Sequence, residues 1–269
     1  MRDKNILFLG DICSESGRQA VISSIKDLKQ SENISFVVAQ GENVAGGYGI
    51  TPKLANELLN AGIDCITLGD HFLDRKDIIP MLESEPRLLR PANFHNDVPG
   101  KGAQIYTVNE IKIGIINLLG RVFLKPIKCP FECALTEIEK LKQETPIIFI
   151  DFHAEATAEK KAFGWFLDGK VSGVIGTHTH VQTADEQILP LGTAYITDIG
   201  MCGAMNSVLG MRIDLSVKKI LYSIPLRLLP AKENVHINGV IITIDSETGK
   251  ALTIKRLCLK IAEPIEQNQ

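Results

Sequence analysis

The sequence predicts an α/β protein in which a largely internal sheet carries helices on its faces. The composition is that of an ordinary globular protein, with 45% hydrophobic and 23% charged residues in a chain of 269, so the chain can bury a sizeable core. Short runs typical of strands alternate with segments of helical periodicity as far as about residue 197. This alternation is the pattern of βαβ units, so we expect one α/β domain over residues 1–269.

Seven short segments are predicted to be strands because they are rich in apolar and β-branched residues. They are residues 5–9, 35–39, 64–68, 111–117, 147–152, 172–175 and 194–197. Helical patterns lie between them, at residues 18–30, 52–61, 131–143 and 155–167. The second helix has the clearest start, because Thr51 can cap it and Pro52 fits its first position.

The last part of the chain has a different pattern. Residues 235–244 and 251–261 flank a turn-rich stretch at 245–249, which predicts a final antiparallel pair of strands. Residues 74–128 are rich in proline and basic residues. We expect any small lobe inserted into the single domain to lie in this range.

Charge and cysteine usage exclude several classes of protein. With 29 Lys+Arg against 32 Asp+Glu, the chain has no excess of basic residues that could hold a phosphate backbone, so stable nucleic-acid binding is not expected. The apolar run near the N-terminus spans only residues 6–9, too short for a signal peptide or a membrane span, so a cytoplasmic protein without membrane association is expected. The six cysteines form no CxxC pair and are interpreted as reduced thiols.

Polar side chains follow five of the predicted strands directly. They are Asp11, Glu42, Asn43, Asp70, His71, Asp151, His153, His178 and His180. Ligands of open α/β sheets bind beyond the carboxyl ends of the strands, so these side chains are expected to share one crevice. Carboxylates, amides and imidazoles are metal ligands, and the sequence therefore predicts a metal site there.

The combination is more informative than any one of these turns. A Gly-Asp pair after a strand is most often a plain turn, and a buried histidine is most often structural. His178 and His180, however, point the same way if the chain is extended. The whole set is too large for one tetrahedral zinc and suits two ions of higher coordination that share a carboxylate. Paired metals about 3.5–4 Å apart catalyse in-line displacement at phosphorus, which makes phosphoester hydrolysis the leading chemistry.

A glycine-rich stretch at residues 41–51 leaves two interpretations open. It lacks the Lys-Ser/Thr ending of a P-loop and does not fit the dinucleotide fingerprint, which argues against nucleoside triphosphates and NAD. The stretch is either a structural turn or a substrate loop that faces a phosphate.

Seven motifs carry a resemblance to a known family. They are Gly10-Asp11 and the segments at residues 41–47, 90–94, 117–123, 151–157, 176–185 and 196–201. At these positions the sequence resembles the YmdB-type metallophosphodiesterases, a branch of the calcineurin-like metallophosphoesterases, from about residue 5 to residue 260. The resemblance implies a four-layer α/β/β/α sandwich and a dinuclear iron or manganese centre. It also implies phosphodiesterase activity on cyclic nucleotides such as 2′,3′-cAMP, and a homo-oligomer.

The resemblance also implies a role for each site residue. One metal would be held by Asp11, Asn43 and His180, and the other by His153 and His178, with Glu42 bridging both. A hydroxide bridging the metals would be the nucleophile. His71 would be the general acid that protonates the leaving alkoxide.

One position departs from the family pattern, because the expected Gly-Asn-His is here Gly69-Asp70-His71. Asp70 can bind the same metal, but it adds negative charge where a phosphodiester approaches and removes an amide donor. The alternative function is therefore a metal-loaded nucleotide sensor or scaffold with weak turnover. Hydrolysis of amide bonds with the same metals fits the ligands but not the spacing of the motifs.

Overall fold

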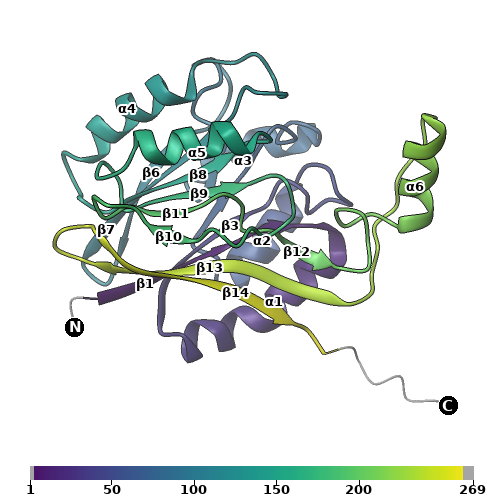
Figure 1. The fold of residues 1–269 in the computed structure, drawn as a ribbon, viewed down its shortest axis with the longest axis horizontal. Helices are drawn as coiled ribbons and strands as arrows, with labels where there is room; N and C mark the ends of the chain where they lie inside the picture. The colour runs from purple at the N-terminus through teal and green to yellow at the C-terminus, as the bar shows by residue number, and fades with distance from the viewer. Residues whose placement is uncertain (1–2, 263–269) are drawn as a thin grey trace.

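Two β-sheets pack face to face in the computed structural model, which describes residues 3–262, and helices cover both outer faces (Figure 1). This is the four-layer α/β/β/α sandwich that the resemblance implies, and the expectation is confirmed. None of the helices within the described residues is long and apolar enough to cross a membrane.

The first sheet has eight strands. Along the sheet they are β2 (Asp11–Ile12), β12 (Met201–Ala204), β13 (Val235–Asp245), β1 (Asp3–Leu9), β3 (Ile34–Gln40), β4 (Cys65–Thr67) and β5 (Leu88–Leu89), while β14 (Ala251–Lys260) pairs with β13. The run from β1 to β5 is parallel, and β13 lies antiparallel to both β1 and β14. The outer face carries α1 (Ser14–Ser31), α2 (Pro52–Ala61) and α3 (Ile79–Ser84). The final antiparallel pair predicted from the sequence is β13 with β14.

The second sheet has six strands. Their order is β10 (Gln187–Ile188), β11 (Ala194–Ile196), β9 (Gly173–Thr177), β8 (Ile148–His153), β7 (Ile111–Leu119) and β6 (Ala103–Val108). The four inner strands are parallel and the two edge strands are antiparallel to their neighbours. Its outer face carries α4 (Pro130–Leu141) and α5 (Thr157–Phe166).

Strand β1 shows why the sheets stack. Leu7 and Leu9 pack in the core beneath the helices of the first sheet, whereas Ile6 and Phe8 pack in the core between the sheets. Successive strand residues point to opposite faces, so an uninterrupted apolar run such as residues 6–9 must be covered on both sides. Between the sheets, the rings of Phe8 and Phe149 lie 5.3 Å apart.

The structure contains each predicted strand and helix and adds elements that the sequence patterns did not predict. α1 begins at Ser14, one turn earlier than expected. Residues 74–128, where an inserted lobe was expected, supply η1 (Lys76–Ile78), α3 and three strands, β5 to β7, which belong to the two sheets. Helix α6 (Ile213–Tyr222) was not predicted and stands apart from the sheets (Figure 1).

Candidate metal centre

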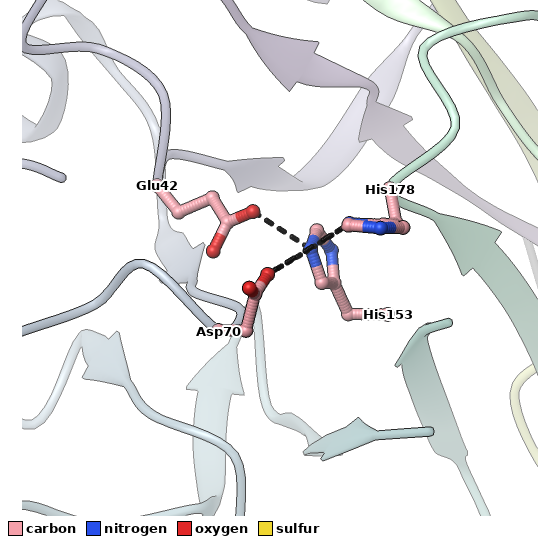
Figure 2. A group of neighbouring side chains, drawn as sticks. All are labelled: Glu42, Asp70, His153 and His178. Carbon is pink, nitrogen blue, oxygen red and sulfur yellow. Dashed lines mark hydrogen bonds and ion pairs between the residues drawn. The ribbon is translucent and has the colours of Figure 1, made fainter. Parts of the chain in front are cut away.

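The predicted site residues come together where strands of both sheets end. Glu42 and Asp70 follow strands of the first sheet, β3 and β4, whereas His153 ends β8 and His178 follows β9 in the second sheet. Figure 2 shows these four side chains pointing toward one another across the junction of the sheets. The stacking of the two sheets therefore builds the cluster.

These four side chains form a tight group, in which one ligand atom from each lies within 4.8 Å of all the others. His153 Nε2 lies 2.7 Å from Glu42 Oε1 and 3.0 Å from His178 Nδ1. Asp70 Oδ1 lies 3.7 Å from His153 Nε2 and 3.8 Å from His178 Nδ1. Two carboxylates and two imidazoles thus converge on one small volume.

A second group lies beside the first. His180 Nε2 is 3.3 Å from Asn43 Oδ1 and 3.8 Å from Asp11 Oδ1. Asp11 Oδ1 is also 3.9 Å from His153 Nδ1, so the two groups adjoin. On the other side of the ring, His180 Nδ1 lies 3.2 Å from the Leu209 carbonyl oxygen. This contact places the proton on Nδ1 and leaves the lone pair of Nε2 available to a metal ion.

The donor set fits metal ions. Asp11 Oδ1 and Asp70 Oδ1 are buried and have no hydrogen-bond partner among the described residues. Buried carboxylate oxygens are costly unless they are paired or coordinate a metal. A Cβ at Gly69 would overlap the ring of His153 and Glu42 Oε2, so glycine leaves room for both ligands. Oxygen and imidazole ligands of this number suit divalent cations of the first transition row.

The electrostatics of the cluster favour an added positive charge. Burial opposes a charge on His153, but the carboxylate of Glu42 and further acidic neighbours raise the His153 pKa well above its usual value. Burial and the charge of His153 lower the pKa of His178 to about 4. Burial also raises the pKa of Asp11. A cation bound here would neutralise the carboxylates, which the protonated His153 does in its absence. His153 would lose its proton on binding, because metal ions displace the protons of the side chains that bind them.

A chain of buried hydrogen bonds orients His153. The Thr67 and Thr177 hydroxyls donate to the two oxygens of Asp151, at 2.5 and 2.7 Å. Thr177 Oγ1 is then left to accept from His153 Nδ1, at 2.9 Å. Nε2 of His153 therefore keeps its lone pair for the cluster. Burial raises the pKa of Asp151 to about 6.

A buried ion pair supports the turn that carries His178 and His180. Both residues have left-handed backbones, with φ of 102° and 64°, which is uncommon for residues other than glycine. Lys160 Nζ donates to Asp198 Oδ2 at 2.7 Å and to the Thr177 carbonyl oxygen at 2.6 Å. Asp198 Oδ2 in turn accepts from the Thr179 N–H, and Asp11 Oδ2 accepts from the His178 N–H.

His71 lies at the rim of the cluster, with 32% of its side chain exposed. Its Nδ1 is 2.9 Å from Asp74 Oδ2, and its Nε2 is 3.8 Å from Asp70 Oδ2. The backbone N–H of His71 donates to Glu42 Oε2. Nε2 is thus the ring nitrogen directed to the ligand cluster.

All eight residues that the sequence analysis assigned to the site lie in this junction. The supporting groups around them are Thr67, Asp74, Asp151, Lys160, Thr177 and Asp198. Of these, only Asp151 was among the side chains expected to share the crevice, and none was assigned a role from the sequence. One signal for Asp151 is present in the sequence, because it precedes His153 by two residues in a strand and so shares its face. The pair of Lys160 and Asp198 has no such signal, because 38 positions separate the two residues.

Comparisons with known proteins agree with this architecture. A family model described as "YmdB-like protein" matches residues 7–257. The 2′,3′-cyclic-nucleotide 2′-phosphodiesterase of Bacillus subtilis (strain 168) is 45% identical over 254 residues, which cover 94% of this chain and 96% of that protein.

Two crystal structures are similar over nearly their whole length. A novel phosphatase from Mycoplasma pneumoniae has a TM-score of 0.91 at 32% identity, with 97% of this chain and 94% of that chain covered. A hypothetical protein from Thermus thermophilus has a TM-score of 0.90 at 33% identity, with 95% and 99% covered. The match to the family model and the similarity to the Bacillus relative show that this chain belongs to the YmdB-like protein family.

Proposed function

We propose that this chain is a metal-dependent phosphodiesterase that binds two cations and hydrolyses cyclic nucleotides such as 2′,3′-cAMP. The observation that carries the proposal is the pair of adjoining ligand groups at the junction of the sheets. The activity named for the Bacillus relative supports the choice of substrate class.

The proposed ligands divide along the two groups. One ion is assigned to Asp11, Asn43 and His180, the other to Asp70, His153 and His178, and Glu42 is assigned to both. Iron or manganese suits this mixture of oxygen and imidazole ligands. Two bound cations would supply a hydroxide nucleophile at neutral pH and neutralise charge that develops on the phosphoryl group.

His71 is the proposed general acid. Its Nδ1 contacts the carboxylate of Asp74, which holds the ring with Nε2 toward the cluster. A partly exposed imidazole can exchange protons with solvent and deliver one to a leaving alkoxide. Asp74 is therefore assigned to orient the acid.

Hydrolysis of 2′,3′-cAMP and of bis-p-nitrophenyl phosphate, with Mn²⁺ or Fe²⁺ present, tests the proposal. His71→Ala is expected to lower the rate by about 10²–10⁴-fold, as removal of a general acid does, while the metal content stays that of the wild type. His95→Ala is the matched control, because the His95 side chain is 71% exposed and pairs only with Asp97 among the described residues. Full activity of His71→Ala, or of the wild type after chelation, would contradict the proposal.

The sensor with weak turnover remains the second candidate because of Asp70. Its carboxylate lies among His153, His178 and His71, and its negative charge would oppose an approaching phosphodiester. The exchange Asp70→Asn separates the two functions. A large gain in rate at unchanged metal content favours the sensor, whereas an unchanged or reduced rate favours the enzyme.

We also infer that the chain forms a homo-oligomer through α6. Five apolar side chains of this helix are about half exposed or more: Ile213, Val217, Ile220, Leu221 and Tyr222. Contiguous exposed apolar surface of this kind marks interaction sites. Light scattering coupled to size exclusion measures the molar mass, and a monomer at micromolar concentration would contradict the inference.

A further inference from the structure

A cavity of about 290 Å³ opens beside the metal ligands and has two unlike walls. One wall consists of site residues: Glu42, Asn43, His71, His178 and His180. The rest of the lining is mostly apolar, with Tyr48, Leu209, Met211, Ile220 and Leu228, and it also includes Ser216 and Lys219. A cavity at the lower end of the usual range of about 300–1,000 Å³ takes one small molecule, which must be anionic or metal-seeking at one end and apolar at the other.

We propose that this apolar wall is the binding site for the base of the cyclic nucleotide, with Tyr48 as its stacking residue and Ile220 of α6 closing the opposite side. The inference rests on the proposed function and extends it, because it assigns the part of the substrate that does not react. A nucleoside cyclic phosphate has the required polarity, since its diester faces the ligands and its flat base faces the apolar wall.

The glycine-rich stretch presents Tyr48 to the cavity. Gly46, Gly47 and Gly49 all have positive φ, between 69° and 97°, a conformation that glycine adopts without strain. A Cβ at Gly47 would overlap Met211 Cε, so the absence of a side chain lets the loop reach the opposite wall. Of the two interpretations that the sequence left open, this favours a substrate loop over a plain turn.

Arg75 holds the Tyr48 loop in place. Its guanidinium donates to the Tyr48 carbonyl oxygen from Nε, at 3.3 Å, and to the Ala45 carbonyl oxygen from Nη2, at 3.1 Å. The Tyr48 side chain itself is 40% exposed, and its ring lies edge-on to His71 with 5.3 Å between the centroids. An aromatic ring fixed beside the proposed general acid and still open to the cavity is suited to stacking on a base.

The rest of the apolar lining combines buried side chains with exposed ones. Met211 is buried and packs with Cys13 and Met201, and Leu228 packs against this group. Ile220, by contrast, is 73% exposed, so a base placed against it would remove apolar surface from water. The wall also holds Ser216, whose buried hydroxyl has no hydrogen-bond partner among the described residues. Rotation about one bond would let this hydroxyl meet a polar edge of the base.

Two cyclic diesters that differ only in the base-bearing part test the inference. We would compare kcat/KM for 2′,3′-cAMP with that for glycerol 1,2-cyclic phosphate, which has no base. Tyr48→Ala is expected to lower the ratio of the two values about tenfold, the size of effect that loss of one base–aromatic stack produces. Tyr48→Phe keeps the ring and is expected to keep the ratio.

Ile220→Ala probes the other side of the cavity without touching the surroundings of His71. It is expected to lower the same ratio about threefold, as the loss of part of an apolar contact does. Leu221→Ala is the matched control, because Leu221 is the next residue of α6, is 67% exposed and does not line the cavity. Titration calorimetry with 3′-AMP and the metal-loaded protein gives a second reading that needs no turnover, and Tyr48→Ala should raise its Kd about tenfold.

The outcomes separate this inference from the proposed function. If the wild type hydrolyses both diesters and neither Tyr48→Ala nor Ile220→Ala changes the ratio, the base lies elsewhere while the proposed function stands. If Ile220→Ala and Leu221→Ala lower the ratio of the kcat/KM values equally, the inference is also overturned. The effect would then come from a general change in α6 and not from contact between Ile220 and the base. If the metal-loaded wild type hydrolyses neither diester, both proposals fall.

Discussion

The ligand cluster and helix α6 lie on either side of one cavity, but their sequences specify them differently. Each cluster residue comes at or just after the end of a strand and is fixed by contacts to another element, as His178 is by Asp11 and His153. In α6, Ser216 is the only buried residue. Ile220 lines the cavity, and Val217, Leu221 and Tyr222 are exposed away from it. The cluster residues thus find their contacts within the fold, whereas α6 leaves apolar side chains exposed to solvent. Substitutions in the cluster should affect metal binding and activity, whereas those at α6 positions outside the cavity, such as Leu221, should affect association.

The largest effect is expected from His153, a central residue of the proposed metal site. His153→Ala removes the imidazole that touches Glu42 and His178, so metal binding should weaken and the rate of diester hydrolysis should fall by a factor on the order of 10³. Elemental analysis and a bis-p-nitrophenyl phosphate assay measure the two effects. A variant with wild-type metal content and rate would remove His153 from the site.

The next largest effect is on stability and comes from the ion pair beneath the histidine turn. Lys160→Met leaves the buried Asp198 carboxylate without its cation and should lower the free energy of unfolding by about 3–5 kcal/mol. Lys161→Met is the matched control, because Lys161 is 45% exposed and pairs with Asp185 at the surface, where a pair is worth at most about 1 kcal/mol. Urea unfolding measures the free energy of unfolding of both variants. Equal decreases in the two variants would show that burial of the pair of Lys160 and Asp198 adds nothing to stability.

A smaller effect on the site is expected from the residue that orients His153 through Thr177. Asp151→Asn keeps the size of the side chain but replaces one acceptor oxygen with a donor, which disturbs the hydrogen bond that fixes the ring. Metal affinity should fall about 10–100-fold, which is the usual loss when the hydrogen bonds that orient a metal-binding histidine are removed. A metal-binding isotherm identical to that of the wild type would show that the hydrogen bonds from Asp151 through Thr177 do not control the orientation of His153.

Asp185 gives a pH dependence remote from the ligands. Burial opposes its charge, but hydrogen bonds from Thr197, Thr183 and Lys161 lower its pKa from 3.8 to about 2. Because the folded pKa lies below the ordinary value, the carboxylate stabilises the fold above about pH 4, and this contribution disappears as the pH falls toward 2. At pH 7 Asp185→Asn should cost about 1 kcal/mol after solvent screening. The free energy of unfolding should differ between wild type and variant at pH 7, and this difference should disappear at or below pH 2.

The smallest effect on the fold is expected in α6. Leu221→Glu changes an exposed position, so the free energy of unfolding should stay within about 0.5 kcal/mol of the wild type. The molar mass in solution should nevertheless fall, because a charge placed in an apolar contact opposes association. A large loss of stability would show that Leu221 packs within its own chain.

The local pattern of the sequence was enough to predict nine of the fourteen strands in the described residues, because these nine are rich in apolar and β-branched residues. It was also enough to predict which polar residues gather, since strand ends in stacked α/β sheets meet at one edge. The two-residue strands β2, β5 and β10 were beyond prediction, because two residues carry no periodicity. Strands β6 and β12 were not predicted either.

The rest of the site depends on contacts between distant parts of the chain. Lys160 and Asp198 meet only after α5 packs on the second sheet, and nothing in the local sequence of either residue indicates the partner. Helix α6 was missed because its apolar positions face away from any core of this chain. Patterns that rely on burial cannot detect a helix of this kind.

Counting the metal ions bound to each chain tests the central claim most directly. The protein would be purified with Mn²⁺ or Fe²⁺ present and measured by elemental analysis beside Glu42→Ala, the variant that lacks the proposed bridging ligand. The two adjoining ligand groups predict about two ions per wild-type chain and fewer in the variant. Fewer than one ion per wild-type chain would contradict a dinuclear centre and leave the proposed phosphodiesterase without its chemistry.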